Sequence, residues 1–349
     1  MIDTIAKRPL ITFALFAYNQ EKYIREAVES AFSQTYEPLE IILSDDCSSD
    51  RTYRIMQEMT ASYEGPHDVR VTRTDVNLGV TPHILLRGSE ARGEIVVVAA
   101  GDDISKPNRC SKHLPIYDDA SVLAVSSKYD LIGDKGQTIK LNVSDPISLD
   151  ARKKQSELFK NIKYDYSVIQ GSTASYRKSV FSLPLPRRYD IDFSEDNLFN
   201  FLIYSNGCKV SISPESLIKY RMHDLALSNH KKTNKNYRDL ELDSRLSSEK
   251  NIQKMEFFIW IAENAKDKSL VNFKELNRRL KFSRTVASWP DKFLLNRVYS
   301  VFLSLLSLDI NLLKWKLARI IGKFPDYQPK KMLEYFRTRN NTIVLSKVD

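Results

Sequence analysis

Short apolar runs alternate with helix-like segments over the first hundred positions of the chain. The runs are rich in Ile, Val, Leu and Phe, and they predict buried strands at 11–17, 39–44, 69–73 and 94–99. Between them, apolar residues recur at helical spacing, first over 20–32 and again after Asp50. Strands that alternate with helices are typical of βαβ units, so the pattern predicts an α/β fold whose mainly parallel, Rossmann-like sheet is flanked by helices.

Polar residues mark the expected starts of the first two helices. Asn19 is a candidate N-cap for the first, because its side-chain oxygen can accept a free backbone N–H. Ser48, Ser49 and Asp50 precede the second, where acceptors and negative charge suit the positive end of a helix. Both helices are therefore expected to begin just beyond the carboxyl end of a strand.

The alternation loosens after Asp103, and the next elements suggest an antiparallel extension. We expect strands over 122–127 and 129–132, a hairpin turn at 133–136, a short strand over 171–176, and a helix over 195–205. Gly207 is placed to close that last helix.

Beyond about residue 229 the chain becomes charged, poor in Pro and Gly, and helical in pattern. Its most apolar part is 293–321, but the longest charge-free run there, 298–308, is about half of the ~20 residues that a membrane-spanning helix needs. Amphipathic helices are expected instead. We therefore predict an α/β domain over 1–228 and a mainly helical region over 229–349 that serves packing, oligomerisation or membrane-surface contact.

Composition and cysteine usage limit the class of protein. Apolar residues make up 42% of the 349 positions and charged residues 28%, which is ordinary for a globular protein with a sizeable core. The three cysteines are widely spaced, odd in number and without a CxxC pair, so neither a disulfide framework nor a zinc site is indicated. No charged start leads into an apolar signal segment. A cytoplasmic location is expected.

The net charge of +9 is concentrated toward the C-terminus. The cations gather at Lys231, Lys232, Lys235, Lys314, Lys316, Arg319 and Lys323. Such a distribution suits anionic partners, although a solvated basic face explains it equally well. Nucleic acid is not the expected partner, because no interleaved aromatic platform accompanies the cations.

Acidic residues follow two of the predicted strands, and these are the candidate chemistry of the chain. Asp45 and Asp46 end the second strand, and Asp102 and Asp103 end the fourth. In an open α/β sheet, ligands bind beyond the carboxyl ends of the strands. Clustered carboxylates repel one another there unless a cation is present, and Mg²⁺ or Mn²⁺ commonly bridges an Asp to a diphosphate. The alternative is that each pair only caps a helix or stabilises a turn.

Other phosphate-binding motifs are missing from the sequence. No GxGxxG follows the first strand, and no GxxxxGK[ST] occurs. Neither a dinucleotide fingerprint nor a P-loop is indicated.

The order of segments resembles that of the family 2 inverting glycosyltransferases, which have the GT-A fold. The resemblance covers about residues 9–224. It rests on ITFALFAYN from Ile11, SAFSQTY from Ser30, IILSDDCSSD from Ile41, NLG from Asn77, RGE from Arg92, AAGDD from Ala99, SED from Ser194 and YRMH from Tyr220. The metal motif departs from the family pattern, because Gly-Asp-Asp lacks the spaced Asp-x-Asp form.

The resemblance implies a role for several residues. Ala17 and Tyr18 would border the nucleotide, Asp46 would bind the base, Asp102 the ribose, and Asp103 the metal and diphosphate. Asp196 would be the general base that takes the proton of the acceptor hydroxyl. Glu195, Asp190 and Asp192 are local rivals for that role, and Glu195 and Asp196 also suit a helix N-terminus without any catalytic duty.

Two residues near the end of the resemblance remain open. His223 is a candidate metal ligand or diphosphate contact, because a neutral imidazole can bind metal, and a structural histidine is the alternative. Arg221 can pair with a phosphate of the donor.

The resemblance implies a nucleotide-sugar donor, with a UDP-sugar favoured, a divalent Mn²⁺ or Mg²⁺, and direct displacement with inversion. The acceptor is expected to be a saccharide or a lipid-linked saccharide in bacterial surface polysaccharide synthesis. A peripheral position at the inner membrane face and a homo-oligomer remain open. The alternative function is a catalytically inactive protein of the same fold that binds a nucleotide or glycan.

Overall fold

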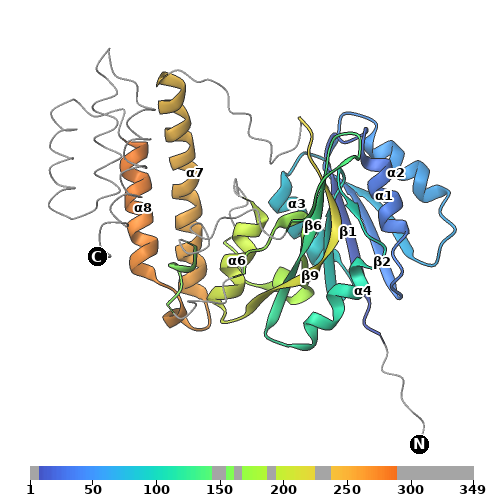
Figure 1. Cartoon of the computed structure of the whole chain (residues 1–349). Coiled ribbons are helices and arrows are strands. Elements are labelled where there is room, and N and C mark those ends of the chain that lie inside the picture. The colour runs from blue at the N-terminus through green and yellow to red at the C-terminus, as the bar shows by residue number, and fades with distance from the viewer. Residues whose placement is uncertain (1–7, 144–154, 161–166, 187–193, 225–236, 289–349) are drawn as a thin grey trace, which may run out of the picture. The chain divides into compact units, whose positions relative to one another are not determined.

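The structure is a computed structural model that describes residues 8–143, 155–160, 167–186, 194–224 and 237–288 (Figure 1). The chain divides into two compact units. One holds residues 1–231 with 254–276, and the other holds 232–253 with 277–349. The boundary expected after residue 228 stays a prediction.

The first part of the chain forms parallel strands joined by helices. Its elements are β1 (Ile11–Ala17), α1 (Ile24–Phe32), β2 (Leu39–Asp45), α2 (Thr52–Ala61), β3 (Asp68–Arg73), α3 (Val80–Glu90) and β4 (Ile95–Ala100). β1 pairs with β2 and β4, and β2 pairs with β3, all in parallel. The four predicted strands and their connections are confirmed.

The following segments extend this sheet with strands of both directions. They are β5 (Ile104–Ser105), α4 (Arg109–His113), η1 (Leu114–Asp118), β6 (Val122–Ile132), β7 (Thr138–Val143), η2 (Gly171–Thr173), β8 (Ser175–Arg177), η3 (Lys178–Ser182), α6 (Glu195–Ser205) and β9 (Lys209–Arg221). The strand order is β3-β2-β1-β4-β8-β6-β9-β5, with β7 beside β6. β8 runs antiparallel to both β4 and β6, so the second half of the sheet is mixed.

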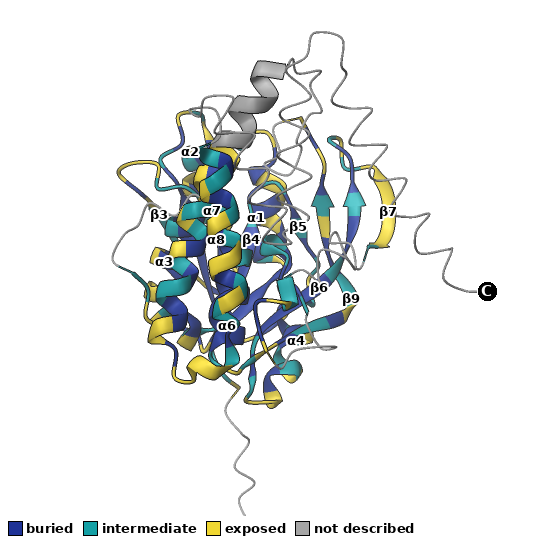
Figure 2. Ribbon diagram, turned by 90° about the vertical axis from the view of Figure 1, so that its left-hand side faces the viewer, coloured by how far each residue is buried: buried dark blue, intermediate teal, exposed yellow. Residues whose placement is uncertain are grey.

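Helices cover both faces of the sheet, and the strands are apolar on both sides for that reason. In β1, Phe13 and Leu15 belong to the larger core cluster, together with residues of α1 and α2. Ala14 points the other way and packs with Ile42 and Val96. Figure 2 shows the central strands as buried and the outer surfaces of the helices as exposed. The predicted α/β fold class is confirmed.

The segment beyond the sheet is helical where it is described. It contains α7 (Tyr237–Asn264), η4 (Lys268–Leu270) and α8 (Phe273–Ala287). Within the first unit, Phe258 of α7 stacks on Phe201 of α6 with ring centroids 4.1 Å apart. No helix in the described ranges is long and apolar enough to cross a membrane. The amphipathic helices expected over 293–321 lie outside the described residues.

Three local expectations were wrong. The first helix begins at Ile24, and Asn19 is no N-cap because its backbone adopts a left-handed φ of 51° while its side chain accepts the N–H of Ser49. The two strands expected over 122–132 form one strand, β6, with register shifts around Lys128. The strand expected over 171–176 begins as the short helix η2.

Candidate functional site

The carboxyl ends of three parallel strands meet at one edge of the sheet. Ala17 is in register with Asp45, and Phe16 with Ala100, so β1, β2 and β4 end at the same level. Asp46 directly follows β2, and Asp102 comes two residues after β4. The acidic residues expected at strand ends are therefore brought to one rim, where an α/β sheet binds ligands.

Asp46 organises the loop that follows β3. Its Oδ1 accepts the hydroxyl of Thr74 at 2.9 Å and the N–H of Leu78 at 3.0 Å, and its Oδ2 accepts the N–H of Gly79 at 2.9 Å. Gly79 has a φ of 79°, which favours glycine. Sequence reasoning noticed the Asn-Leu-Gly motif but missed this contact. Asp46 is thus a loop anchor, and base binding by its carboxylate stays a prediction.

Ala17 and Tyr18 lie at the end of β1. The carbonyl of Ala17 accepts the N–H of Asp46 at 2.9 Å, which ties the first two strand ends together. The Tyr18 side chain is 48% exposed, so its ring can face a planar ligand at this edge. Contact of these two residues with a nucleotide stays a prediction.

Asp102 is paired with His223. The Nε2 of His223 lies 2.9 Å from Oδ2 of Asp102, and its ring packs 4.5 Å from that of Tyr23. His223 comes two residues after β9, while Asp102 comes two residues after β4. The structure therefore brings His223 to Asp102, whereas His223 was expected to be a metal ligand together with Asp103.

Asp103 is turned away from solvent, with 5% exposure. Its Oδ1 accepts the backbone N–H of Arg221 at 2.9 Å, and no hydrogen bond from the described residues reaches the buried Oδ2. Burial and, next, the Asp102 carboxylate raise the pKa of Asp103, the N–H of Arg221 and the side chains of Ser172 and Arg109 lower it, and the result is a pKa of about 7. Burial therefore disfavours the ionised form of this carboxyl.

Arg221, the last residue of β9, forms hydrogen bonds to three other segments near the site. Its Nε donates to the carbonyl of Asp102 at 2.9 Å, its Nη1 to the carbonyl of Asp134 at 3.1 Å, and its Nη2 to Oε2 of Glu26 at 2.9 Å. The guanidinium is buried and lies over the ring of Tyr23. Because these contacts occupy all three of its nitrogens, the phosphate contact expected of Arg221 stays a prediction.

Glu195 and Asp196 open α6. Oδ1 of Asp196 accepts the N–H of Asn197 at 2.6 Å and its amide Nδ2 at 3.3 Å. Burial raises the pKa of Asp196, and burial together with the Asp196 charge raises the pKa of Glu195 to about 7. A Glu195 carboxyl with this pKa can exchange a proton close to neutral pH. Their rivals Asp190 and Asp192 lie outside the described residues.

Gly171 connects these carboxyls to the same edge of the sheet. A Cβ added at Gly171 would lie 1.9 Å from Oε1 of Glu195, so the glutamate rests directly on this glycine. Three residues later, the carbonyl of Ala174 accepts the N–H of Val98, on β4, at 3.0 Å. The start of α6 thus lies near the strand end that carries Asp102.

A divalent ion fits Asp102 and His223 only with help from a substrate. Within the described ranges, no three His, Cys, Asp or Glu side chains converge to hold an ion by themselves. Mg²⁺ is commonly bound by one or two protein groups together with substrate phosphates and water. The Asp102–His223 pair and the unsatisfied Oδ2 of Asp103 are compatible with that arrangement.

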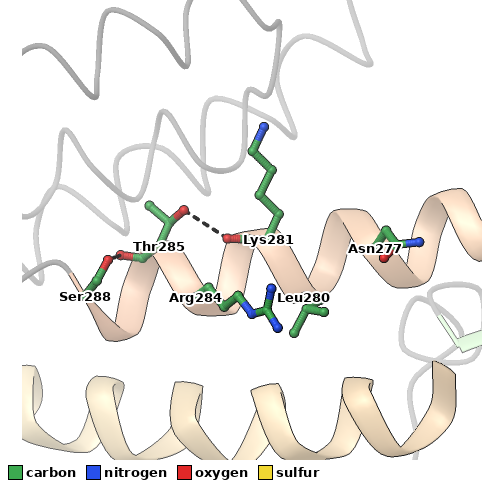
Figure 3. A pocket seen from close by; sticks show the side chains of 6 residues that line it. All are labelled: Asn277, Leu280, Lys281, Arg284, Thr285 and Ser288. Atoms are coloured by element: carbon green, nitrogen blue, oxygen red, sulfur yellow. Dashed lines mark hydrogen bonds between the residues drawn. The ribbon is translucent and has the colours of Figure 1, made fainter. Parts of the chain in front are cut away.

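A separate hollow of about 390 Å³ lies on α8 (Figure 3). It is lined by Asn277, Leu280, Lys281, Arg284, Thr285 and Ser288. This lining contains no carboxylate, thiol or imidazole, so it offers neither a general base nor the usual metal ligands.

Comparison with known proteins identifies a family and relatives of the chain. Residues 12–183 match the model of the family described as glycosyl transferase family 2. An uncharacterized glycosyltransferase of Haemophilus influenzae is 27% identical over 226 residues, 62% of this chain and 66% of that protein. The succinoglycan biosynthesis protein ExoO of Rhizobium meliloti is 29% identical over 137 residues, 39% of this chain and 38% of that protein.

A solved structure shares the fold. The crystal structure of Staphylococcus aureus TarS residues 1–349 in complex with UDP aligns with a TM-score of 0.52 and 18% identity, covering 89% of this chain and 82% of that one. At this identity the likeness concerns the fold alone. The chain spans less than two thirds of the length of several curated relatives that it matches, including 38% of ExoO.

Proposed function

This chain belongs, through residues 12–183, to glycosyl transferase family 2, and on that premise we propose that it transfers a sugar from a nucleoside diphosphate to an acceptor hydroxyl. The observation that carries the proposal is the presence of two separate carboxylate sites near one sheet edge. Asp102 is paired with His223, and Glu195 with Asp196 opens α6. A displacement reaction needs two such groups, one for the departing diphosphate and one for the attacking hydroxyl.

Asp196 is the proposed general base. Burial raises its pKa, which brings its proton affinity closer to what proton transfer near neutral pH requires. It would take the proton of the acceptor hydroxyl while that oxygen attacks the anomeric carbon on the face opposite the diphosphate. Direct displacement from the opposite face inverts the configuration of the sugar.

Asp102 and His223 are the proposed protein ligands of Mn²⁺ or Mg²⁺. When bound, the ion would neutralise charge on the leaving diphosphate. This assignment exchanges the roles that the resemblance gave to Asp102 and Asp103. The support for the exchange is that Asp102 is next to the imidazole, whereas Asp103 directs Oδ1 to the backbone of Arg221.

The donor and acceptor follow from the relatives as proposals. A UDP-sugar is favoured, since TarS of the same fold was crystallised with UDP. The acceptor would be a saccharide or lipid-linked saccharide of a bacterial surface polysaccharide, in line with the name of ExoO. A cytoplasmic enzyme that touches the inner membrane face, alone or as a homo-oligomer, would suit such an acceptor.

Calorimetry with UDP, GDP, CDP and dTDP, with and without Mn²⁺, tests the donor half of the proposal. We expect one nucleotide to bind in a metal-dependent manner, and Asp102→Ala to weaken that binding. The anomeric configuration of the product, followed by NMR from the start of the reaction, tests inversion. Nucleotide binding without any transfer or donor hydrolysis would favour an inactive binding protein, and no nucleotide binding would refute the donor assignment.

A further inference from the structure

Arg109 in α4 is a fully buried cation in the core beside the proposed site. Its side chain is 0% exposed. Nη1 donates to the hydroxyl of Ser105 at 3.0 Å, and Nη2 donates to three backbone carbonyls: Val98 at 2.7 Å, Ser172 at 2.9 Å and Ala174 at 3.0 Å. Burying a charge is costly, and an apolar side chain could fill such a volume. The arginine therefore calls for an explanation beyond packing.

The three carbonyls belong to two segments that carry different parts of the site. Val98 lies on β4, four residues before Asp102. Ser172 and Ala174 lie between Gly171 and β8, and Gly171 supports the carboxyl of Glu195. The Arg109 guanidinium thus joins two segments. One is β4, which precedes the proposed metal ligand Asp102, and the other is the 171–174 loop, which contacts Glu195 next to the proposed base Asp196.

The hydrogen bonds of the sheet join β4 to β8 only as far as Ala174. The ladder between β4 and β8 runs from Ile95↔Arg177 to Val97↔Ser175, and one further bond joins the N–H of Val98 to Ala174. Beyond that point, the carbonyl of Ser172 bonds to Arg109. On its other side the loop is held by Ser126, whose hydroxyl lies 2.5 Å from that of Thr173. Arg109 therefore extends the contact with β4 past the end of the ladder, toward Gly171.

We propose that Arg109 is a positioning residue that sets the separation between the diphosphate-binding carboxylate and the general base. The proposal rests on the proposed function. Any shift of the 171–174 loop is passed to Glu195, because that carboxyl contacts Gly171 directly. Asp196 is its chain neighbour and would move with it. A misplacement of about 1 Å at a reacting group can cost on the order of 100-fold in rate.

Arg109→Met is the main test. We expect kcat to fall about 10- to 100-fold, as for a misplaced reacting group, while the Kd for nucleotide with Mn²⁺ is unchanged. Arg109→Lys should recover part of the loss, since an ammonium can reach some of the same acceptors but not in the planar fork. Equal losses in kcat and nucleotide binding, in step with a lower Tm, would mark an ordinary core residue and overturn the proposal.

Arg177→Met is the matched control. Arg177 also donates to backbone carbonyls, including that of Val122 at 2.9 Å, but it does so at the other end of β8. We expect its replacement to lower Tm without a selective loss of kcat. If Arg177→Met and Arg109→Met reduce kcat alike, the position of Arg109 near the site has no special importance.

Hydrogen exchange provides a readout that does not depend on transfer activity. In Arg109→Met, the amides of 171–174 and of 195–198 should exchange faster than in Arg177→Met, with β1 and β2 unchanged. Gly171→Ala covers the case in which Arg109→Met does not fold, since it disturbs Glu195 without emptying the core and should lower kcat at constant nucleotide Kd. Unchanged exchange, or full activity of Gly171→Ala, would refute the positioning role. A wild-type enzyme that binds nucleotide but transfers no sugar would instead refute the proposed function.

Discussion

Two buried glutamates, Glu40 and Glu195, behave in opposite ways. Glu40 on β2 is 0% exposed, and it accepts the hydroxyl of Thr12 at 2.6 Å, and the backbone N–H and Nε of Arg92 at 2.9 and 2.8 Å. Arg70 lies 3.5 Å away. Burial pushes the pKa of Glu40 up, but the hydrogen bonds from Thr12 and Arg92 outweigh it and the pKa ends below the usual value.

Among the described residues, Glu195 has no such set of side-chain donors. Within the described part of the chain, its own backbone N–H is the hydrogen bond that lowers its pKa, and burial beside Asp196 raises that pKa to about 7. A carboxylate with its full set of donors stabilises the fold. A carboxylate that lacks them destabilises it and is kept where proton transfer or ligand binding uses it. On the proposed function, we expect this difference to separate a structural acid, Glu40, from an acid of the site, Glu195.

The largest effect is expected from Asp196→Asn. Loss of a general base should reduce kcat about 10²- to 10⁴-fold, with nucleotide Kd and Tm little changed. Glu195→Gln is the matched variant and should lose less. Steady-state kinetics and calorimetry on the two proteins decide between them. If Asp196→Asn retains activity and Glu195→Gln does not, the base is Glu195.

The next effect is on stability, at Glu40. Glu40→Gln should lower the free energy of unfolding by about 1.5–3 kcal/mol, the range for hydrogen bonds to a charged group, and leave kcat per folded molecule unchanged. Urea unfolding measures it. Glu58→Gln removes an exposed partner of Arg54 and should cost about 0.5 kcal/mol or less. A large loss of kcat in folded Glu40→Gln would erase the distinction between the two glutamates.

Asp102 and Asp103 extend the comparison to neighbouring residues. Asp102→Ala should weaken metal-dependent nucleotide binding about 10- to 100-fold, the equivalent of one charged contact. Asp103→Asn should weaken it less, since Asp103 faces the backbone of Arg221. Calorimetry with and without Mn²⁺ measures both. A larger loss of binding in Asp103→Asn than in Asp102→Ala would indicate that Asp103 is the metal ligand.

The smallest expected effect is a difference in pH dependence. The pKa of Glu195 is raised from about 4.5 to about 7 on folding. As pH rises, the unfolded chain therefore releases this proton before the folded chain does, and the free energy of unfolding falls between about pH 4.5 and pH 7. Glu195→Gln should therefore gain stability over wild type as pH rises through that window. The lowered pKa of Glu40 acts in the opposite sense, since its stabilisation is present above about pH 4.5 and is lost in acid.

Tm measured from pH 4 to 8 without metal tests the two signs. His83, whose burial lowers its pKa to about 4, titrates in the same window but cancels in the differences from wild type. Parallel difference curves for Glu195→Gln and Glu40→Gln would contradict the assignment of one glutamate to function and the other to structure.

The central strands β1 and β4 were predictable because both faces of the sheet are covered there, which makes them nearly continuous apolar runs. The start of α1 was not, because Asn19 bonds to Ser49, 30 residues away, and does not cap its own helix. Asp102, His223 and Asp196 could be selected from motifs. The pairing of Asp102 with His223 depends on a contact across 121 residues, and no local pattern encodes it.

Glu40 and Arg109 were missed for a related reason. Glu40 is the second residue of β2 and is followed by the apolar run Ile41–Leu43, and Arg109 is the first residue of the short helix α4. The sequence near each residue does not indicate burial. The buried Glu40 is stabilised by donors, and the buried Arg109 by acceptors, that belong to other segments of the chain. The fold class can be predicted from local periodicity, whereas polar networks form between distant segments and become visible only in the tertiary structure.

The position of β8 in the sheet has a consequence for synthesis of the chain. β4 is entirely apolar, and its outer edge is paired only when residues 174–177 have been made. An unpaired apolar edge strand invites association with other chains. His223 must also emerge before Asp102 gains its partner. During translation, the first hundred residues can assemble local βαβ units. They nevertheless expose the apolar edge of β4 until Arg177 has left the ribosome, and Asp102 lacks its partner until His223 has followed.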